Sequence, residues 1–252
     1  TEFMERAKDL RETVKSALVY PVILIMVAVV SVIVLLIFVV PQFTQMFEES
    51  GKALPLATQI VVAAGEFFQA WWWALIGGSL VLYALFKRQM ADPDSRYRWD
   101  ELFLGLPLIG DLVAKIEMAR FSRTLGTLLD NGVSLLAALT IVKETLTNSV
   151  MADRLDEVAT KLREGKGLGS PLLEAEVFPK LGVHMVMVGE ETGRLSEMLI
   201  QVADVFDREV QTAVKRTLGL LEPALILGLG LVIGAIIMSI LVAILSVNEL
   251  AV

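Results

Sequence analysis

Side chains that could carry chemistry are few and far apart in this sequence. His184 is the only histidine and there is no cysteine, so a protein-built zinc site, which needs several nitrogen or sulfur ligands, is not expected. No serine, histidine and aspartate with the roles of a catalytic triad emerge. Residues 165–170 (Gly-Lys-Gly-Leu-Gly-Ser) look superficially like a phosphate loop, yet they lack the Gly-x-x-x-x-Gly-Lys-Ser/Thr spacing and follow a predicted helix. The sequence therefore predicts no catalytic residue, no metal and no cofactor.

Two carboxylates remain as candidates for contacts rather than for catalysis. Glu190 lies in residues 189–193 (Gly-Glu-Glu-Thr-Gly), which form either a partner-binding turn or a turn whose glycines serve backbone geometry while Glu190 caps or pairs locally. Glu222 precedes Pro223 at the entrance to a long apolar run. A carboxylate near lipid is a functional candidate by default, although one at the interface can simply reach water.

The element around which the chain is organised is the stretch from Gly193 to Val247, which begins three residues after Glu190 and contains Glu222. Its first half has apolar residues at three- and four-residue spacing, which indicates one packed helical face. From Ala224 to Val247 it supplies the roughly 20 apolar residues needed to cross a hydrocarbon core of about 30 Å. One helix is thus predicted to leave a helical bundle and enter a bilayer. Gly230 and Gly234, one turn apart, predict close packing against another span, although glycine is common in spans.

The composition places the chain in the membrane class. Hydrophobic residues make up 55% of its 252 residues, above the roughly 45–50% of soluble domains. The net charge is -7, with 22 basic and 29 acidic residues, whereas a nucleic-acid partner would require a basic face. Membrane lipid is therefore an expected contact and nucleic acid is not.

The fold class predicted from these patterns is all-α, with three transmembrane helices and an up-and-down helical bundle between the second and third spans. Ser134 and Asn148 are expected to cap bundle helices, and Asn131-Gly132 is expected to end one in a left-handed cap. Basic residues near the spans place the N-terminus in the cytoplasm and the C-terminus outside it. The predicted segments are a cytoplasmic helix (1–16), transmembrane helix 1 (17–40), a periplasmic loop (41–66), transmembrane helix 2 (67–86), a cytoplasmic helical domain (87–219), transmembrane helix 3 (220–247) and a periplasmic tail (248–252).

A weak internal echo links the first and third spans. Residues 17–21 (Ala-Leu-Val-Tyr-Pro) resemble residues 219–223 (Gly-Leu-Leu-Glu-Pro), and each pentapeptide opens a long apolar run after a charged helix. If the echo is real, residues 1–16 are the tail of an earlier copy of the helical domain that this chain lacks. Alternatively, any helix that enters a membrane through a proline has this appearance.

Specific residues of the chain resemble the type II secretion system F family. The resemblance covers nearly the whole chain and includes Ala17-Leu18-x-Tyr20-Pro21 in the region of the first span. One departure is Val242-Ala243-Ile244, where the family often has a proline. The residues that carry the motif of the cytoplasmic domain, for structure or partner contact, are Phe121, Leu125, Gly132, Gly165, Phe178, Pro179, Gly189, Glu190, Gly193 and Leu195.

This resemblance implies a non-enzymatic platform in the bacterial inner membrane, with several spans. The implied partners are a cytoplasmic secretion ATPase, other inner-membrane secretion components, pseudopilins and further copies of the chain as a homo-oligomer. The implied role is to pass the work of the ATPase to pseudopilus assembly. Glu222, Pro223, Gly230 and Gly234 are the candidates for membrane helix packing or coupling.

Two other functions stay open at this point. A type IV pilus assembly platform shares the same motifs, so the sequence does not separate it from a secretion platform. A small-molecule membrane transporter subunit belongs to another class, and it would need polar groups along a path between broken spans. The predicted spans contain little that is polar beyond Ser31, Gln69, Ser79, Ser239 and Ser246.

Overall fold

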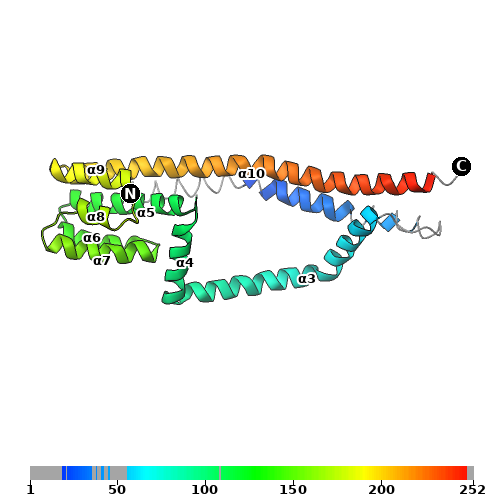
Figure 1. Ribbon diagram of the computed structural model, residues 1–252, viewed down its shortest axis with the longest axis horizontal. Coiled ribbons are helices and arrows are strands. Elements are labelled where there is room, and N and C mark those ends of the chain that lie inside the picture. Colours follow the sequence, from blue (N-terminus) through cyan, green and yellow to red (C-terminus); the bar gives the residue numbers. More distant parts are fainter. Residues whose placement is uncertain are drawn as a thin grey trace. The chain divides into compact units, whose positions relative to one another are not determined.

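The computed structural model describes residues 19, 20, 22–35, 38, 41, 42, 45, 56–107 and 109–248. Every regular element among these residues is helical, so the predicted all-α fold is confirmed for the described part of the chain. The chain divides into two compact units, of which unit 1 comprises residues 1–83 and 215–252 and unit 2 comprises residues 84–214. Figure 1 labels the helices of both units.

Unit 2 is a bundle of helices joined by short connections. Helix α5 (Ile109–Asp130) lies between the beginning of α10 on one side and α6 and α7 on the other (Figure 1). Helix α4 crosses the end of this layer at a steep angle to α5. The bounds of the other helices are Pro93–Gly105 for α4, Leu135–Thr145 for α6, Ser149–Arg163 for α7, Gly169–Glu174 for α8, Lys180–Glu191 for α9 and Leu195–Asn248 for α10.

The core of unit 2 follows from helical spacing in the sequence. Helix α5 buries Phe121 and Leu125 one turn apart, and α10 buries Leu199 and Phe206 two turns apart. Side chains at these spacings share one face of a helix. Full burial of each contributes about 1.5–3 kcal/mol. Because Leu199 and Phe206 belong to the same core as α5, the first half of α10 is an integral part of the bundle.

Three glycines end bundle helices in the left-handed conformation. Gly132, Gly165 and Gly193 have φ of +79°, +85° and +71°. In each case the glycine amide donates to the carbonyl three residues earlier, and the following amide donates to the carbonyl five residues earlier. This is the Schellman pattern, which satisfies the last carbonyls of a helix and favours glycine because it has no Cβ. The left-handed cap predicted at Gly132 is confirmed.

The two predicted N-caps have different outcomes. Asn148 precedes α7, and its side-chain oxygen accepts a hydrogen bond from the Met151 amide at 3.1 Å, so this cap is confirmed. Ser134 occupies the N-cap position of α6 but its side chain makes no capping hydrogen bond, so the prediction is right about the position and wrong about the bond. Apolar burial of Ala138, Leu139 and Val142 holds α6 in place instead.

Unit 1 contains apolar helical segments with little cover from the rest of the chain. Helix α3 (Leu56–Ala91) begins well before the predicted span 67–86, so residues 56–66 of the predicted loop are helical, because this stretch is mostly apolar and contains no proline. By length and hydropathy, the stretch Leu195–Ser239 of α10 can cross a membrane, and α3 is a second candidate if its two bent halves form one span. The apolar helix Val22–Val34 is shorter than a full span. Three transmembrane helices therefore stay a prediction.

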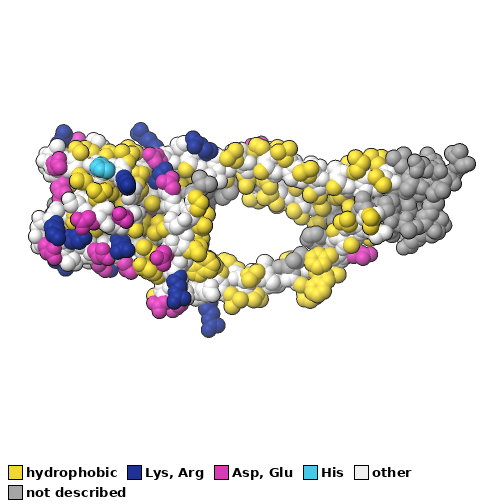
Figure 2. Space-filling model, in the orientation of Figure 1, with side chains coloured by type: hydrophobic (Ala, Val, Ile, Leu, Met, Phe, Trp, Pro, Cys, Tyr) yellow, Lys and Arg dark blue, Asp and Glu magenta, His cyan; other side chains and the backbone are white. Residues whose placement is uncertain are grey.

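Helix α10 belongs to both units. It is assigned without a break from Leu195 to Asn248 and passes the boundary between Val214 and Lys215 as well as Pro223. Figure 2 shows charged side chains gathered over unit 2 and hydrophobic side chains over the described helices of unit 1. The sequence of one helix thus changes from a half-buried, charged pattern to a nearly uncharged apolar one.

Candidate functional site

The carboxylate of Glu190 joins two turns that are far apart in the sequence. It lies in the last turn of α9, and its two oxygens accept hydrogen bonds from the backbone amides of Leu168 at 2.6 Å and Gly169 at 2.9 Å. These amides open α8, where the first N–H groups of a helix have no partner within the helix. We call the carboxylate and these two amides the Glu190 clasp. Of the two interpretations from the sequence, the structure supports a capping role.

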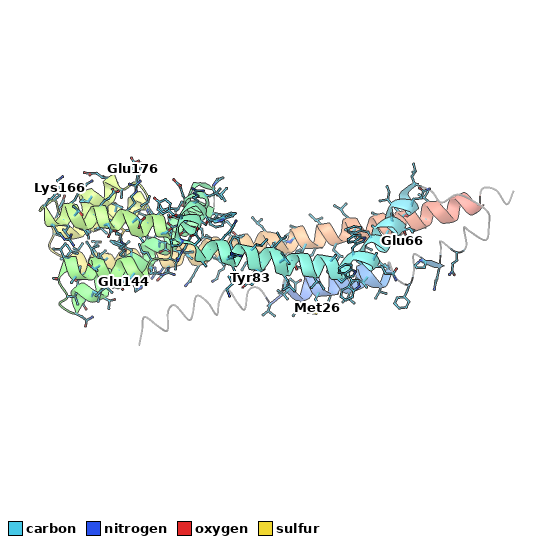
Figure 3. The ribbon with its side chains drawn as sticks, turned by 90° about the horizontal axis from the view of Figure 1, so that it is seen from below. Met26, Glu66, Tyr83, Glu144, Lys166 and Glu176 are labelled. Atoms are coloured by element: carbon cyan, nitrogen blue, oxygen red, sulfur yellow. The ribbon has the colours of Figure 1, made fainter. Side chains whose placement is uncertain are left out.

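The loop before α8 is shaped to admit this carboxylate. Gly167 has a φ of +74°, and a Cβ atom added to it would lie 2.6 Å from Oε1 of Glu190. A side chain at this position would therefore displace the carboxylate from the clasp. Gly165 has a φ of +85°, but a Cβ there would meet nothing within 4 Å among the described atoms. Lys166, labelled in Figure 3, lies between the two glycines with its side chain more than half exposed.

On the other side of Glu190, two glycines connect α9 to α10. A Cβ on Gly189 would lie 2.7 Å from Cβ of Met198, so the two helices approach too closely there for any larger residue. Gly193 supplies the left-handed turn between them. Leu195, the first residue of α10, packs against the core. The residues of the predicted motif from Gly165 to Leu195 thus form one junction between α8, α9 and α10.

The aromatic residues of the predicted motif lie in the core below this junction. The rings of Phe121 and Phe178 have centroids 5.5 Å apart, a distance typical of favourable aromatic pairs. Leu125 is fully buried in the same core, and Pro179 precedes the first residue of α9. Gly132 ends α5 at a separate turn and does not join the clasp. Phe121, Leu125 and Phe178 thus pack in the core of unit 2, and Glu190 is the central polar group of the junction above them.

A second polar cluster, which the sequence reasoning missed, holds the loop between α6 and α7. Glu117 is 2% exposed, and it accepts hydrogen bonds from the Thr147 amide at 3.1 Å, from the Thr147 hydroxyl and from Arg120 at 3.2 Å. Asp100 on α4 accepts from the Ser149 amide at 2.8 Å. Glu117 lies four residues before Phe121, so a charged residue at the spacing of the buried face was the available signal.

Ion pairs fix the first half of α10 against α5. The guanidinium of Arg123 donates to Asp204 at 2.8 Å and to Asp207 at 2.6 Å. Burial lowers the pKa of Arg123, but the hydrogen bonds that it donates to these two carboxylates outweigh the effect of burial, and the net pKa is raised. Lys115 bridges Asp111 and Glu209, and hydrogen bonds to these carboxylates raise its pKa. Both cations therefore stay charged while α10 is in place.

In unit 1 the structure gives Glu222 a partner. Its carboxylate interacts with the hydroxyl group of Tyr20, and each residue directly precedes a proline in the internal echo. The contact therefore joins equivalent positions of the first and third apolar runs. Pro223 lies inside α10 without ending it. A Cβ on Gly230 or Gly234 would meet no described atom within 4 Å, so the described part of the chain does not pack against that face.

Comparison with known proteins relates the sequence of this chain to a family. Residues 121–243 match the family model described as type II secretion system (T2SS), protein F. The chain carries a domain of the type II secretion system protein F family. The match covers the clasp, the Phe121–Phe178 pair and most of the apolar part of α10, whereas Glu117 and Asp100 lie before it.

Relatives of the protein F domain come from secretion and pilus systems alike. The chain is 39% identical over 241 residues to the type II secretion system protein F of Xanthomonas campestris, which covers 96% of this chain and 60% of that protein. It is 36% identical over 244 residues to the type IV pilus assembly protein PilC of Myxococcus xanthus, and this match covers 97% of the chain and 58% of the PilC protein. The PilC protein of Thermus thermophilus is 38% identical over 236 residues, covering 93% and 58%. The chain thus spans about three fifths of the length of these relatives.

Proposed function

We propose that this chain is the membrane-anchored part of an inner-membrane platform in a type II secretion system, where it couples a cytoplasmic ATPase to pseudopilus assembly. Membership of the protein F family supports a place in secretion or pilus machinery. The coupling role, the three spans, the cytoplasmic N-terminus and the periplasmic C-terminus are part of the proposal. The platform works without chemistry of its own, as a mechanical connection between a bundle and its spans.

The observation that carries the proposal is the composition of α10. Its first half is held by the buried residues Leu199 and Phe206 and by the ion pairs of Arg123. Its second half is an apolar helix long enough to cross a bilayer. A helix packed in this way shifts with its bundle as a rigid body. A displacement that an ATPase imposes on the bundle would therefore reach the apolar half of α10.

A substitution within α10 tests the coupling. Residues 215–217 are replaced by Gly-Gly-Ser in the intact secretion machine, and the matched control carries Ala-Ala-Ala at the same positions. Both variants lose the same side chains, but each glycine weakens the helix by about 1 kcal/mol relative to alanine. Secretion is expected to fail with Gly-Gly-Ser and to persist with Ala-Ala-Ala, at equal protein levels in the membrane. Equal secretion by both variants would contradict obligatory coupling through this helix.

A pilus assembly platform is the second candidate, because PilC proteins are among the similar relatives at comparable identity. Purification of the chain from its native membrane separates the two candidates. Co-purification of pseudopilins supports the secretion platform, and co-purification of a major pilin supports the pilus platform. A transporter is less well supported, since the 770 Å³ cavity between residues 24–33, α3 and α10 has Gln69 as its only polar side chain among the lining residues.

A further inference from the structure

Unit 2 exposes an apolar surface where α4 turns into α5. Leu102, Leu106 and Ile109 are 53%, 38% and 47% exposed. Leu102 and Leu106 are four residues apart and therefore share one side of α4 and its C-cap. The opposite side of α4 faces the bundle, where Asp100 is buried and Leu104 packs against the core. The outer side is thus free of contacts from the described core of the unit.

Three basic residues accompany this apolar surface. Lys87 and Arg88 lie in the last turns of α3, and Arg98 lies one turn before Leu102 on α4. All three are exposed, and none forms an ion pair with another described residue. In Figure 2, basic side chains project where the end of α3 joins α4. Deeper in the unit, Lys115 and Arg123 are each paired with two carboxylates.

Aromatic rings hold the end of α3 against α4. The centroids of Phe86 and Trp99 are 5.7 Å apart, and those of Trp99 and Phe103 are 5.9 Å apart. Since all three rings lie within unit 2, these contacts hold the basic end of α3 next to α4. We call the exposed residues Lys87, Arg88, Arg98, Leu102, Leu106 and Ile109, which lie on these two connected helices and at the start of α5, the elbow patch.

We infer that the elbow patch binds the surface of a bilayer that contains anionic lipids. The inference rests on the proposed function only in that the apolar run 67–86 of α3 crosses the membrane. Lys87 directly follows that run, whose 20 residues would be about 30 Å long as a straight helix, the thickness of the hydrocarbon core, and which bends between Ala74 and Ile76. The patch therefore begins at the lipid headgroups, where aromatic and basic side chains are favoured.

The chemistry of the patch matches that of an anionic membrane surface. Exposed leucine and isoleucine side chains gain free energy by entering the boundary between headgroups and acyl chains, and lysine and arginine remain among the phosphates. Each basic residue near an anionic surface strengthens binding roughly fivefold. Asp92 at the N-cap of α4 and Asp94 and Glu101 on α4 are exposed as well, so the basic residues are required to make the surface attractive to anionic lipid. Docked in this way, α4 would hold the bundle at a defined angle to the bilayer.

Spin labelling of the full chain tests the inference, because the absence of cysteine makes every introduced thiol unique. Leu102→Cys and Leu106→Cys carry a nitroxide in nanodiscs of phosphatidylcholine with or without phosphatidylglycerol. Accessibility to oxygen and to a water-soluble nickel chelate reports the surroundings of the label. Leu80→Cys in the proposed span is the lipid reference, and Asp153→Cys, exposed on α7, is the water reference. Both elbow labels are expected to resemble the lipid reference when phosphatidylglycerol is present.

A charge variant supplies the second measurement. The triple variant Lys87→Gln, Arg88→Gln, Arg98→Gln should lower the ratio of docked to undocked label by roughly fivefold for each charge removed. The matched control removes three basic residues elsewhere in unit 2 (Arg154→Gln, Lys161→Gln, Lys166→Gln) and should leave the ratio unchanged.

The possible outcomes separate the inference from the function on which it rests. If both elbow labels match Asp153→Cys while Leu80→Cys lies in lipid, the inference is overturned and a protein partner becomes the expected occupant. An equal effect of the two triple variants also overturns it, because the attraction would not come from the patch. If Leu80→Cys is itself in water, the proposed span fails as well.

Discussion

Gly167 and Glu190 share one small space, although they are 23 positions apart: a Cβ atom on residue 167 would lie 2.6 Å from Oε1 of Glu190. The carboxylate fills the position that a side chain would take, and from there it reaches the first two amides of α8. Gly167, which is outside the predicted motif, and Glu190, which belongs to it, therefore depend on each other. Neither residue can change without affecting the other.

Gly167→Ala is expected to destabilise unit 2 by about 2–4 kcal/mol. A non-glycine residue at positive φ contributes about 1 kcal/mol of this, and displacement of the carboxylate from its amides contributes about 1–3 kcal/mol. Hydrogen exchange of the α8 and α9 amides in the full chain measures the loss. Gly165→Ala is the matched control, since its φ is also positive but its Cβ would meet no described atom. Equal losses in the two variants would show that the clash with Glu190 has no effect.

Glu190→Gln tests the charge of the clasp without changing its shape. The amide of glutamine offers one oxygen, and its NH₂ group would face one of the two backbone donors. We expect exchange at Leu168 and Gly169 to become faster, with a loss of about 1–3 kcal/mol in local stability. Glu191→Gln is the control, because the neighbouring Glu191 is exposed and no hydrogen bond joins its side chain to a described residue. Unchanged exchange in Glu190→Gln would refute the clasp.

Glu117→Ala should open the loop between α6 and α7. The substitution removes a 2% exposed carboxylate that accepts from the Thr147 amide and pairs with Arg120. A loss of about 3 kcal/mol is expected, at the lower end for a broken buried pair because Arg120 can reach water. Glu144→Ala, at an exposed residue labelled in Figure 3, should change stability by no more than about 0.5 kcal/mol. Similar losses for the two variants would remove Glu117 from this role.

The features that the sequence predicts correctly are those that depend on local interactions. The turn at Gly132 and the cap at Asn148 depend on residues within five positions, so composition and spacing were enough to predict them. The buried faces of α5 and α10 follow from apolar periodicity for the same reason. The predicted span 67–86 is shorter than helix α3, because the length of a span is set by the thickness of the bilayer, whereas a helix can extend beyond it.

The polar interactions of the site could not be predicted in this way. Glu190 accepts a hydrogen bond from the amide of Leu168, which lies 22 residues earlier in the sequence, and Arg123 donates one to Asp204, which lies 81 residues later. Such pairs depend on how the helices pack, which periodicity does not specify. The sequence showed that residues 189–193 form a turn, but the choice between capping and partner binding required the position of α8.

The ion pair between Lys161 and Glu174 predicts that the stability of the folded chain depends on pH. A hydrogen bond from Lys161 lowers the pKa of Glu174 below its ordinary value of 4.5. A carboxylate with a lowered pKa in the folded state contributes stability above the unfolded pKa and loses it as the pH falls through the folded pKa. Wild type should therefore be more stable than Glu174→Gln at neutral pH, and the difference should vanish well below pH 4.5. Denaturant unfolding at both pH values measures it, and a constant difference would contradict the prediction.

Arg123→Met should loosen the anchorage of α10 in the bundle. The 12% exposed guanidinium holds Asp204 and Asp207, and without it two carboxylates one turn apart on α10 face α5 without their cation. A loss of about 2–4 kcal/mol is expected, with faster hydrogen exchange along residues 199–210. Arg154→Met removes an exposed pair with Glu157 and should change stability by less than about 1 kcal/mol. Adding Asp204→Asn and Asp207→Asn to Arg123→Met should recover part of the loss, because the repulsion between the carboxylates is then removed. If the arginine variants behave alike, or if the asparagines recover nothing, α10 is held by apolar packing alone and the ion pairs have no part in transmitting force.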